Sequence, residues 1–181
     1  MNFYEYIQLA LKTKAPAASP LEDLQHAGSG LFTEVGELID QFKRERFYKK
    51  ELDLVHLKEE LGDVYWYFAV AAKVVDVCDY TDWTPVMLPH YTVTAAKLGA
   101  LVSNVNVLAY TRNEEAFDYF IEDYLQEIWY RLQDLCSAFG FNREEIWLMN
   151  IDKLKARYGS VFTEEAAINR DLQNERKVME C

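Results

Sequence analysis

Apolar residues recur at alternating intervals of three and four along most of this chain, and that spacing is typical of one buried face of an α-helix. The first long stripe consists of Leu31, Val35, Leu38 and Phe42. The second stripe consists of Leu54, Leu57, Leu61, Val64, Phe68, Ala71 and Val75. The two stripes predict helices over about residues 20–48 and 51–77, packed antiparallel against each other.

The remaining segments are also helical in pattern, so the predicted fold class is all-α. Ser19 and Pro20 are typical of a helix start, whereas Gly28 and Gly30 are expected to interrupt or loosen the helix that follows. Further helices are predicted over about 2–14, 91–108, 114–139 and 143–158. The expected architecture is an antiparallel helical bundle of about five to six helices.

Length and composition indicate a single domain. A chain of 181 residues, half of them apolar, can bury one well-packed core and gives little reason for a second. We expect that domain to span residues 1–159. Residues 160–181 are rich in charge and are expected to form a peripheral C-terminal tail.

The two helical hairpins resemble each other in pattern. The stripe Leu31, Val35 and Leu38 aligns with Leu101, Val105 and Leu108. A degenerate internal repeat and two unrelated amphipathic hairpins both explain this, and the alternatives stay open. In such a repeat Glu34, Glu37, Glu60 and Asp63 would correspond to Asn104, Val107, Tyr124 and Glu127.

The charge and the cysteines exclude several classes of function. A net charge of −11 repels a nucleic-acid backbone, so no nucleic-acid partner is expected. The three cysteines, Cys78, Cys136 and Cys181, form no CxxC pair, which argues against a disulfide framework and a zinc site. No signal peptide and no long uninterrupted apolar run is present, so we expect a cytoplasmic protein without a membrane segment.

Four carboxylates are expected to meet where the two long helices pack. Glu34 and Glu37 each precede a residue of the first stripe, and Glu60 and Asp63 each precede a residue of the second. Clustered carboxylates repel one another unless a multivalent cation neutralises them, and a site made of oxygen donors suits Mg²⁺ or Mn²⁺. An isolated pair of this kind is usually a solvated helix edge, but two matched pairs favour a metal site.

A second polar cluster lies on the helix predicted over 143–158. Asn150, Lys153 and Arg157 are spaced by three and four residues and therefore share one helical face. Arginine binds phosphate oxygens in a bidentate manner and lysine supplies a point charge, so this face could clamp phosphates. An ordinary polar surface is the alternative.

Three segments, taken together and in this order, resemble the MazG-like all-alpha nucleoside triphosphate pyrophosphohydrolases. They are TEVGELIDQF, EELGDVYWY and NIDKLKARYG. The resemblance implies a Mg²⁺-dependent enzyme that converts a nucleoside triphosphate and water into a nucleoside monophosphate and pyrophosphate, in control or house-cleaning of the nucleotide pool. It implies that Glu34, Glu37, Glu60 and Asp63 bind the metal. It also implies that Asn150, Lys153 and Arg157 hold the triphosphate, and that a homodimer could form.

The resemblance also implies catalytic roles. Glu34 or Glu37 would orient or deprotonate the attacking water, and Lys153 and Arg157 would stabilise the departing pyrophosphate. One position departs from the family pattern, because Thr33 stands where the family usually has the first glutamate of EExxE. The role of that carboxylate must be absent or supplied by another group such as Glu59.

Two other functions compete with this one. A di-iron bundle needs Glu-x-x-His pairs, and no histidine of this chain follows a glutamate at that spacing, since His26 and His56 each follow an aspartate, Asp23 and Asp53. A catalytically inactive helical interaction module would leave the acidic edges solvated. Base preference is not fixed by the sequence: Trp66 and Tyr67 could flank a base, but aromatic residues at such positions more often belong to the core.

Overall fold

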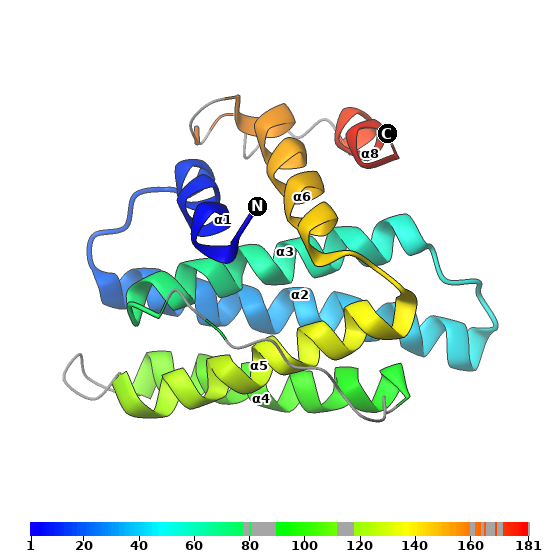
Figure 1. Ribbon diagram of the computed structural model, residues 1–181, viewed down its shortest axis with the longest axis horizontal. Helices are drawn as coiled ribbons and strands as arrows, with labels where there is room; N and C mark the ends of the chain where they lie inside the picture. The colour runs from blue at the N-terminus through cyan, green and yellow to red at the C-terminus, as the bar shows by residue number, and fades with distance from the viewer. Residues whose placement is uncertain are drawn as a thin grey trace.

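The computed structural model is a helical bundle without strands in the part of the chain that it describes, which comprises residues 1–77, 80, 90–111, 118–159, 162, 163, 165, 169 and 172–180. Its helices are α1 (Phe3–Ala10), α2 (Pro20–Tyr48), α3 (Leu54–Val74), α4 (Tyr91–Thr111), α5 (Asp118–Phe139), α6 (Arg143–Tyr158) and α8 (Leu172–Glu180), with a 3₁₀ turn, η1 (Leu11–Thr13), after α1. The predicted all-α bundle is therefore confirmed (Figure 1).

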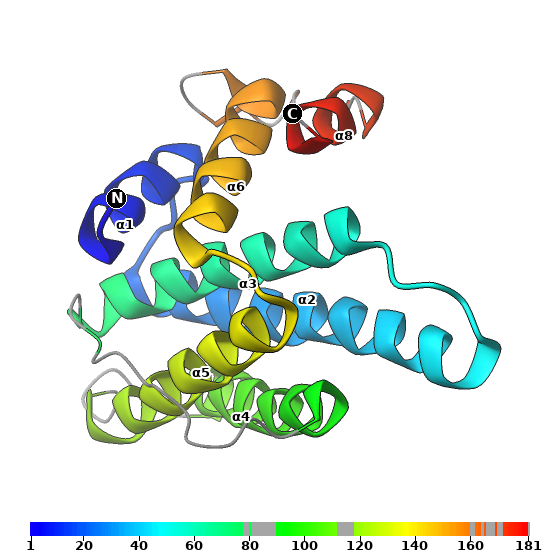
Figure 2. The same cartoon turned by 45° about the vertical axis from the view of Figure 1, so that its right-hand side comes forward.

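The helices are arranged in three layers around the antiparallel pair α2 and α3 (Figures 1 and 2). The hairpin of α4 and α5 lies on one side of this pair, with α4 packed against α2. On the opposite side, α1 and α6 pack on α3, and α8 packs on α6. The central pair is thus covered on both faces, and α3 is the most deeply buried of the long helices.

Helix α2 runs without interruption from Pro20 to Tyr48, so the expected break near Gly28 and Gly30 is wrong. The Ser19 side chain caps its first turn by accepting a hydrogen bond from the backbone of Glu22. The two glycines provide space rather than flexibility. A Cβ on Gly28 would lie 3.1 Å from the backbone of Asn106, and one on Gly30 would lie 2.1 Å from the ring of Tyr67.

Helix α3 is shorter at both ends than the predicted segment 51–77. It begins after Asp53, whose side chain accepts hydrogen bonds from the backbones of Val55 and His56, and its last residue is Val74. Helix α6 matches its prediction, with Asn142 as the N-cap and Gly159 after the last turn. These caps fix where each helix starts, and hence which residues face the space between them.

The second hairpin lies against the first, but only Val105 of the three positions in α4 that the repeat alignment selected is fully buried. In α4 the buried residues include Leu98, Val102, Val105 and Ala109, whereas Leu101 and Leu108 are only partly buried. The difference has a physical cause: α4 packs against α2 and against α5, so its buried face is set by two neighbours. The predicted start of α5 near Glu114 lies outside the described residues.

Among the described residues, α4 is also the one helix long and apolar enough to cross a membrane by length and composition alone. The core helix of a globular domain passes the same test, so this is weak evidence for a membrane segment. Here α4 packs against α2 and α5 and contributes Leu98, Val102 and Val105 to the core.

The C-terminal segment contains a helix that the sequence pattern did not predict. Helix α8 packs against α6, and the side chain of its residue Glu175 is buried. Glu175 forms a bidentate ion pair with Arg157 of α6, with donor–acceptor distances of 2.9 and 2.6 Å. A second ion pair joins Arg176 to Asp53 at the start of α3. The segment is therefore tied to both helices.

The close approach of Tyr67 to Gly30 predicts opposite effects for two glycine-to-alanine substitutions in α2. Gly36→Ala should stabilise the fold by about 0.5–1 kcal/mol, because alanine favours the helix and no atom lies within 4 Å of the added Cβ. Gly30→Ala should destabilise it by about 1–3 kcal/mol, because the ring of Tyr67 must move. Urea unfolding of both variants measures the difference, and equal stabilities would contradict the close packing.

Candidate functional site

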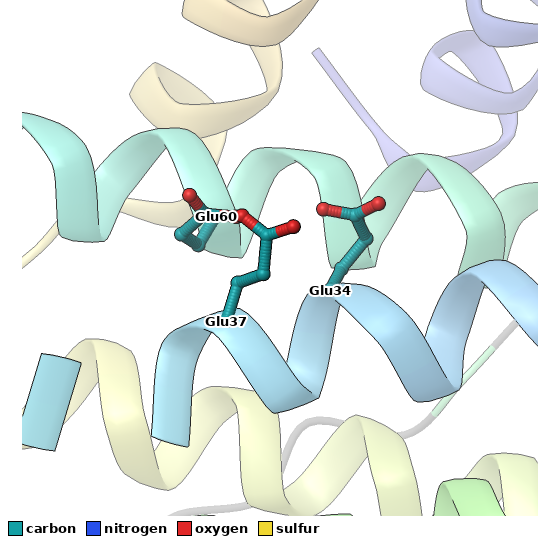
Figure 3. A group of neighbouring side chains, drawn as sticks. All are labelled: Glu34, Glu37 and Glu60. Carbon is teal, nitrogen blue, oxygen red and sulfur yellow. The ribbon is translucent and has the colours of Figure 1, made fainter. Parts of the chain in front are cut away.

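Three glutamates converge where α2 and α3 pack together. Glu34 and Glu37 project from successive turns of α2, and Glu60 projects toward them from α3 (Figure 3). One carboxylate oxygen from each lies within 4.8 Å of those of the other two. The convergence follows from the stripes: Val35, Leu38 and Leu61 are fully buried between the helices, and their acidic neighbours in sequence border that contact.

Asp63, the fourth predicted carboxylate, lies one turn further along α3 and is held by α6. Lys153 Nζ forms an ion pair with both of its oxygens, at 2.7 Å from Oδ1 and 2.5 Å from Oδ2. Asn150 Nδ2 donates a hydrogen bond to Oδ1 at 2.8 Å. Lys153 is almost fully buried. The structure therefore gathers three of the four carboxylates into one group and supports the fourth from behind.

A cavity of about 500 Å³ opens over these carboxylates, and we call it the acidic cavity. Its acidic part is formed by Glu34, Glu37, Glu59, Glu60 and Asp63. The rest of its wall is lined by Thr13, Ala15, His26, His56, Trp66, Tyr67, Leu154, Arg157, Tyr158 and Phe162. The cavity thus has carboxylates on one part of its wall and aromatic rings on another, a combination suited to a ligand with a charged and an aromatic end.

The crowding of the carboxylates changes their acidity. Burial raises the pKa of Glu60 to about 9, and the charges of Asp63, Glu37 and Glu34 add to the effect. Burial also raises the pKa of Glu34 to about 7, again with contributions from Asp63 and Glu37. Both shifts mean that the ionised cluster is costly without a compensating cation.

This donor set fits a hard divalent cation. All three converging groups offer carboxylate oxygens, which Mg²⁺ and Mn²⁺ prefer. Lys153 balances Asp63, whereas no lysine or arginine in the described part of the chain forms an ion pair with Glu34, Glu37 or Glu60, and the Nδ1 atom of His56 lies 3.2 Å from Glu60 Oε1. A positive charge placed among the trio would offset both the burial and the repulsion that raise the pKa of Glu34 and of Glu60.

The predicted phosphate-binding residues do not all face the cavity. Arg157 lines it, but Asn150 and Lys153 are buried beneath Asp63 and are not part of its wall. Arg157 is itself paired with Glu175 of α8. Burial lowers the pKa of its guanidinium, but the hydrogen bond and the charge of Glu175 outweigh that effect and raise the pKa overall. That Asn150 and Lys153 hold a triphosphate therefore stays a prediction.

The structure also places the residues around the Thr33 departure. Thr33 donates a hydrogen bond to the backbone of Gly30 and does not line the cavity. Glu59 does line the cavity, with Oε1 at 3.5 Å from Lys153 Nζ and Oε2 at 3.3 Å from His56 Nδ1. The carboxylate suggested as a substitute for the missing glutamate is thus present at the site.

Two groups near the site escaped the sequence analysis. Glu175 belongs to a segment expected to be peripheral, and no motif marked it. Tyr6 of α1 reaches Asn150, although nothing in its local pattern distinguishes it from a core tyrosine.

Asp53, the partner that a di-iron site would require for His56, is the N-cap of α3 and pairs with Arg176. The second hairpin offers uncharged Asn104 and Val107, both exposed, at the positions aligned with Glu34 and Glu37.

The raised pKa of Glu60 predicts how stability depends on pH in chelator. Its folded-state pKa of about 9 exceeds its ordinary value of 4.5, so its stabilising contribution is complete below about pH 4.5 and is lost as pH rises through 9. Between pH 6 and 9 the melting temperature of the wild type should fall more steeply than that of Glu60→Gln. At pH 9, Mg²⁺ should raise the melting temperature of the wild type by several degrees.

Differential scanning fluorimetry with EDTA or Mg²⁺ measures both effects. Glu127→Gln is the matched control, because Glu127 is an exposed carboxylate on α5 at the position aligned with Asp63. Its pH dependence should follow that of the wild type. Parallel curves for the wild type and Glu60→Gln would contradict the assignment of the raised pKa.

A comparison with known protein families identifies what the acidic helix pair is similar to. The model of the MazG nucleotide pyrophosphohydrolase domain matches residues 23–87. That range contains the three converging glutamates and Asp63, together with most of α2 and the whole of α3. No curated protein and no solved structure matches the chain. The similarity therefore covers the acidic helix pair and leaves out α1, α6 and α8.

Proposed function

We propose that this chain is a MazG-like nucleotide pyrophosphohydrolase that hydrolyses nucleoside triphosphates to nucleoside monophosphates and pyrophosphate in a Mg²⁺-dependent reaction, and the match of residues 23–87 to the MazG domain supports this proposal. The observation that carries the proposal is the convergence of Glu34, Glu37 and Glu60 at the wall of a cavity that also has an aromatic part. Carboxylates bind the metal that a triphosphate requires, and rings can accommodate a base.

Glu34, Glu37, Glu60 and Asp63 would hold Mg²⁺, with Mn²⁺ as the alternative. When bound, such an ion lowers the pKa of a coordinated water and neutralises charge on phosphate oxygens. In the reaction, the oxygen of water forms a bond to the α-phosphorus, the bond from that phosphorus to the bridging oxygen breaks, and pyrophosphate leaves with the bond's electron pair.

The protein's own groups would position the water and receive its proton. Glu34 or Glu37 is the proposed base, because both carboxylates line the acidic cavity where the attacking water would lie. Glu59 faces the same cavity and supplies a further carboxylate where Thr33 lacks one. Arg157 at the cavity wall is the cation best placed to contact the departing pyrophosphate, and Lys153 supports Asp63.

The aromatic part of the acidic cavity is the proposed site for the base. Trp66 is fixed there, because its Nε1 donates to Ala10 O at 3.2 Å and to Thr13 Oγ1 at 2.9 Å. Tyr67 lies beside it, with the two ring centroids 4.8 Å apart. The ring of Tyr158 lies 5.1 Å from that of Phe162, and both line the cavity. Rings accept any base by stacking, so these contacts leave the preferred base to measurement.

The proposal has four further parts: a single catalytic domain over residues 1–159, a cytoplasmic location, the absence of nucleic-acid and membrane partners, and a homodimer. The charge of −11 supports the lack of a nucleic-acid partner. Exposed apolar side chains on α2 and α4 support self-association, and they include Phe32, Phe47, Val107 and Tyr110.

Pyrophosphate release from a panel of canonical and modified nucleoside triphosphates tests the reaction. We expect release that requires Mg²⁺, stops in chelator and falls by at least about a hundredfold in Glu37→Gln, because the variant loses one charged member of the cluster. Glu127→Gln should retain wild-type rates. Absence of release from every substrate would favour the catalytically inactive interaction module.

A second measurement tests the role of Arg157. Arg157→Lys keeps the charge but loses the planar guanidinium, which pairs with Glu175 along one edge and can contact phosphate with its remaining N–H groups, so KM for the triphosphate should rise about tenfold. Lys155→Arg is the control, because Lys155 is exposed on the same helix and pairs with Asp152. Steady-state kinetics give both values. An unchanged KM in Arg157→Lys would remove Arg157 from the phosphate site.

A further inference from the structure

Helix α1 lies outside the segment that matches the MazG family, yet one of its side chains reaches the supports of the acidic cavity. Tyr6 is fully buried between α3 and α6. Its hydroxyl donates a hydrogen bond to Asn150 Oδ1 at 3.1 Å and lies 3.5 Å from the carbonyl oxygen of Gly62. The Asn150 amide is the group that contacts Asp63.

The hydrogen bonds form a directed chain that ends on a carboxylate. Tyr6 donates to the oxygen of the Asn150 amide, and the nitrogen of that amide donates to Asp63 Oδ1 at 2.8 Å. If the amide were turned over, its oxygen would face the Asp63 carboxylate and its NH₂ would face the Tyr6 hydroxyl. The tyrosine hydroxyl therefore favours the one orientation in which Asn150 can support Asp63.

Gly62 provides the space for this arrangement. A Cβ at Gly62 would lie 3.0 Å from Asn150 Cβ and 3.2 Å from Asn150 Nδ2. These distances are shorter than ordinary side-chain contacts. The lack of a side chain at Gly62 therefore allows the Asn150 amide to lie close to α3, within hydrogen-bond distance of Asp63.

Packing alone does not account for a tyrosine at position 6. Its ring is stacked on Trp147, with centroids 5.3 Å apart and an interplanar angle of 18°, and a phenylalanine ring would fill the same space. Burying the hydroxyl costs free energy unless it finds a partner, and the partner here is Asn150. The hydroxyl is thus the part of Tyr6 that connects it to the site, through its hydrogen bond to Asn150.

We propose that Tyr6 is a positioning residue for the acidic cavity: through the Asn150 amide, its hydroxyl holds Asp63 in the orientation in which this carboxylate serves the metal site. Asp63 also lines the cavity, while Asn150 and Lys153 hold it from behind. The inference rests on the proposed function, because it assigns Tyr6 to the same site. Groups that orient a ligand carboxylate typically change metal affinity by ten- to a hundredfold.

The test compares two substitutions that each remove one buried hydroxyl. Tyr6→Phe breaks the chain to Asp63. Tyr65→Phe is the matched control, because Tyr65 is equally buried but its hydroxyl lies 3.7 Å from Cys136 Sγ, away from the carboxylates. Mn²⁺ affinity, measured from the electron paramagnetic resonance signal of the free ion, is the readout that does not depend on turnover. Pyrophosphate release gives kcat and KM, and thermal unfolding confirms that both variants fold.

For Tyr6→Phe we expect Mn²⁺ affinity to weaken about tenfold and kcat to fall by a similar factor, with KM changed less than twofold. Tyr65→Phe should match the wild type in all three. In an Asn150→Ala background, Tyr6→Phe should have no further effect on Mn²⁺ affinity, because the amide through which it acts is gone.

Two results would overturn the inference while the proposed function stands. One is a Tyr6→Phe variant with the Mn²⁺ affinity and kcat of Tyr65→Phe. The other is an undiminished effect of Tyr6→Phe in the Asn150→Ala background, which would show a structural role. Failure of the proposed function looks different: the wild type itself would neither bind Mn²⁺ nor release pyrophosphate.

Discussion

The packing of α2 on α3 is the contact on which the rest of the structure depends. Leu31, Val35 and Leu38 of α2 and Leu57, Leu61 and Val64 of α3 are fully buried, and burial of such side chains contributes about 1.5–3 kcal/mol each. The same contact forces Glu34, Glu37 and Glu60 together, because each stands next to a stripe residue. The apolar contact thus offsets the repulsion among the carboxylates that it creates.

Helix α6 compensates part of the negative charge of these carboxylates. Lys153 of α6 is buried against Asp63, and Asn150 adds a hydrogen bond to the same carboxylate, so one of the four acidic groups is balanced by the protein itself. The glutamate trio has no comparable lysine or arginine among its described contacts, and burial together with the neighbouring carboxylates raises the pKa of Glu34 and of Glu60. This unequal compensation is the electrostatic basis of the proposed metal site, in which Lys153 balances part of the negative charge at Asp63 and a cation would balance the rest of the four-carboxylate cluster.

The peripheral helices supply side chains at the wall of the acidic cavity and behind it. Helix α1 supplies Tyr6, α6 supplies Arg157 and Tyr158, and α8 brings Glu175 to Arg157. The match to the MazG domain ends at residue 87, so these residues of α1, α6 and α8 lie outside the matched segment, although they contribute to the site. The hairpin of α4 and α5 covers the opposite side of α2 and offers no carboxylate at the positions aligned with Glu34 and Glu37.

The sequence by itself determined the helical fold, the pairing of α2 with α3 and the three glutamates that converge, because apolar periodicity and the spacing of neighbouring residues are local properties of a chain. It misjudged Gly28 and Gly30, whose role depends on Asn106 and Tyr67 in other helices. Only the tertiary structure decided that Lys153 lies behind Asp63, that Glu175 pairs with Arg157 and that Tyr6 reaches Asn150. These contacts join residues far apart in sequence, and their partners are set by how whole helices pack, which no local pattern encodes.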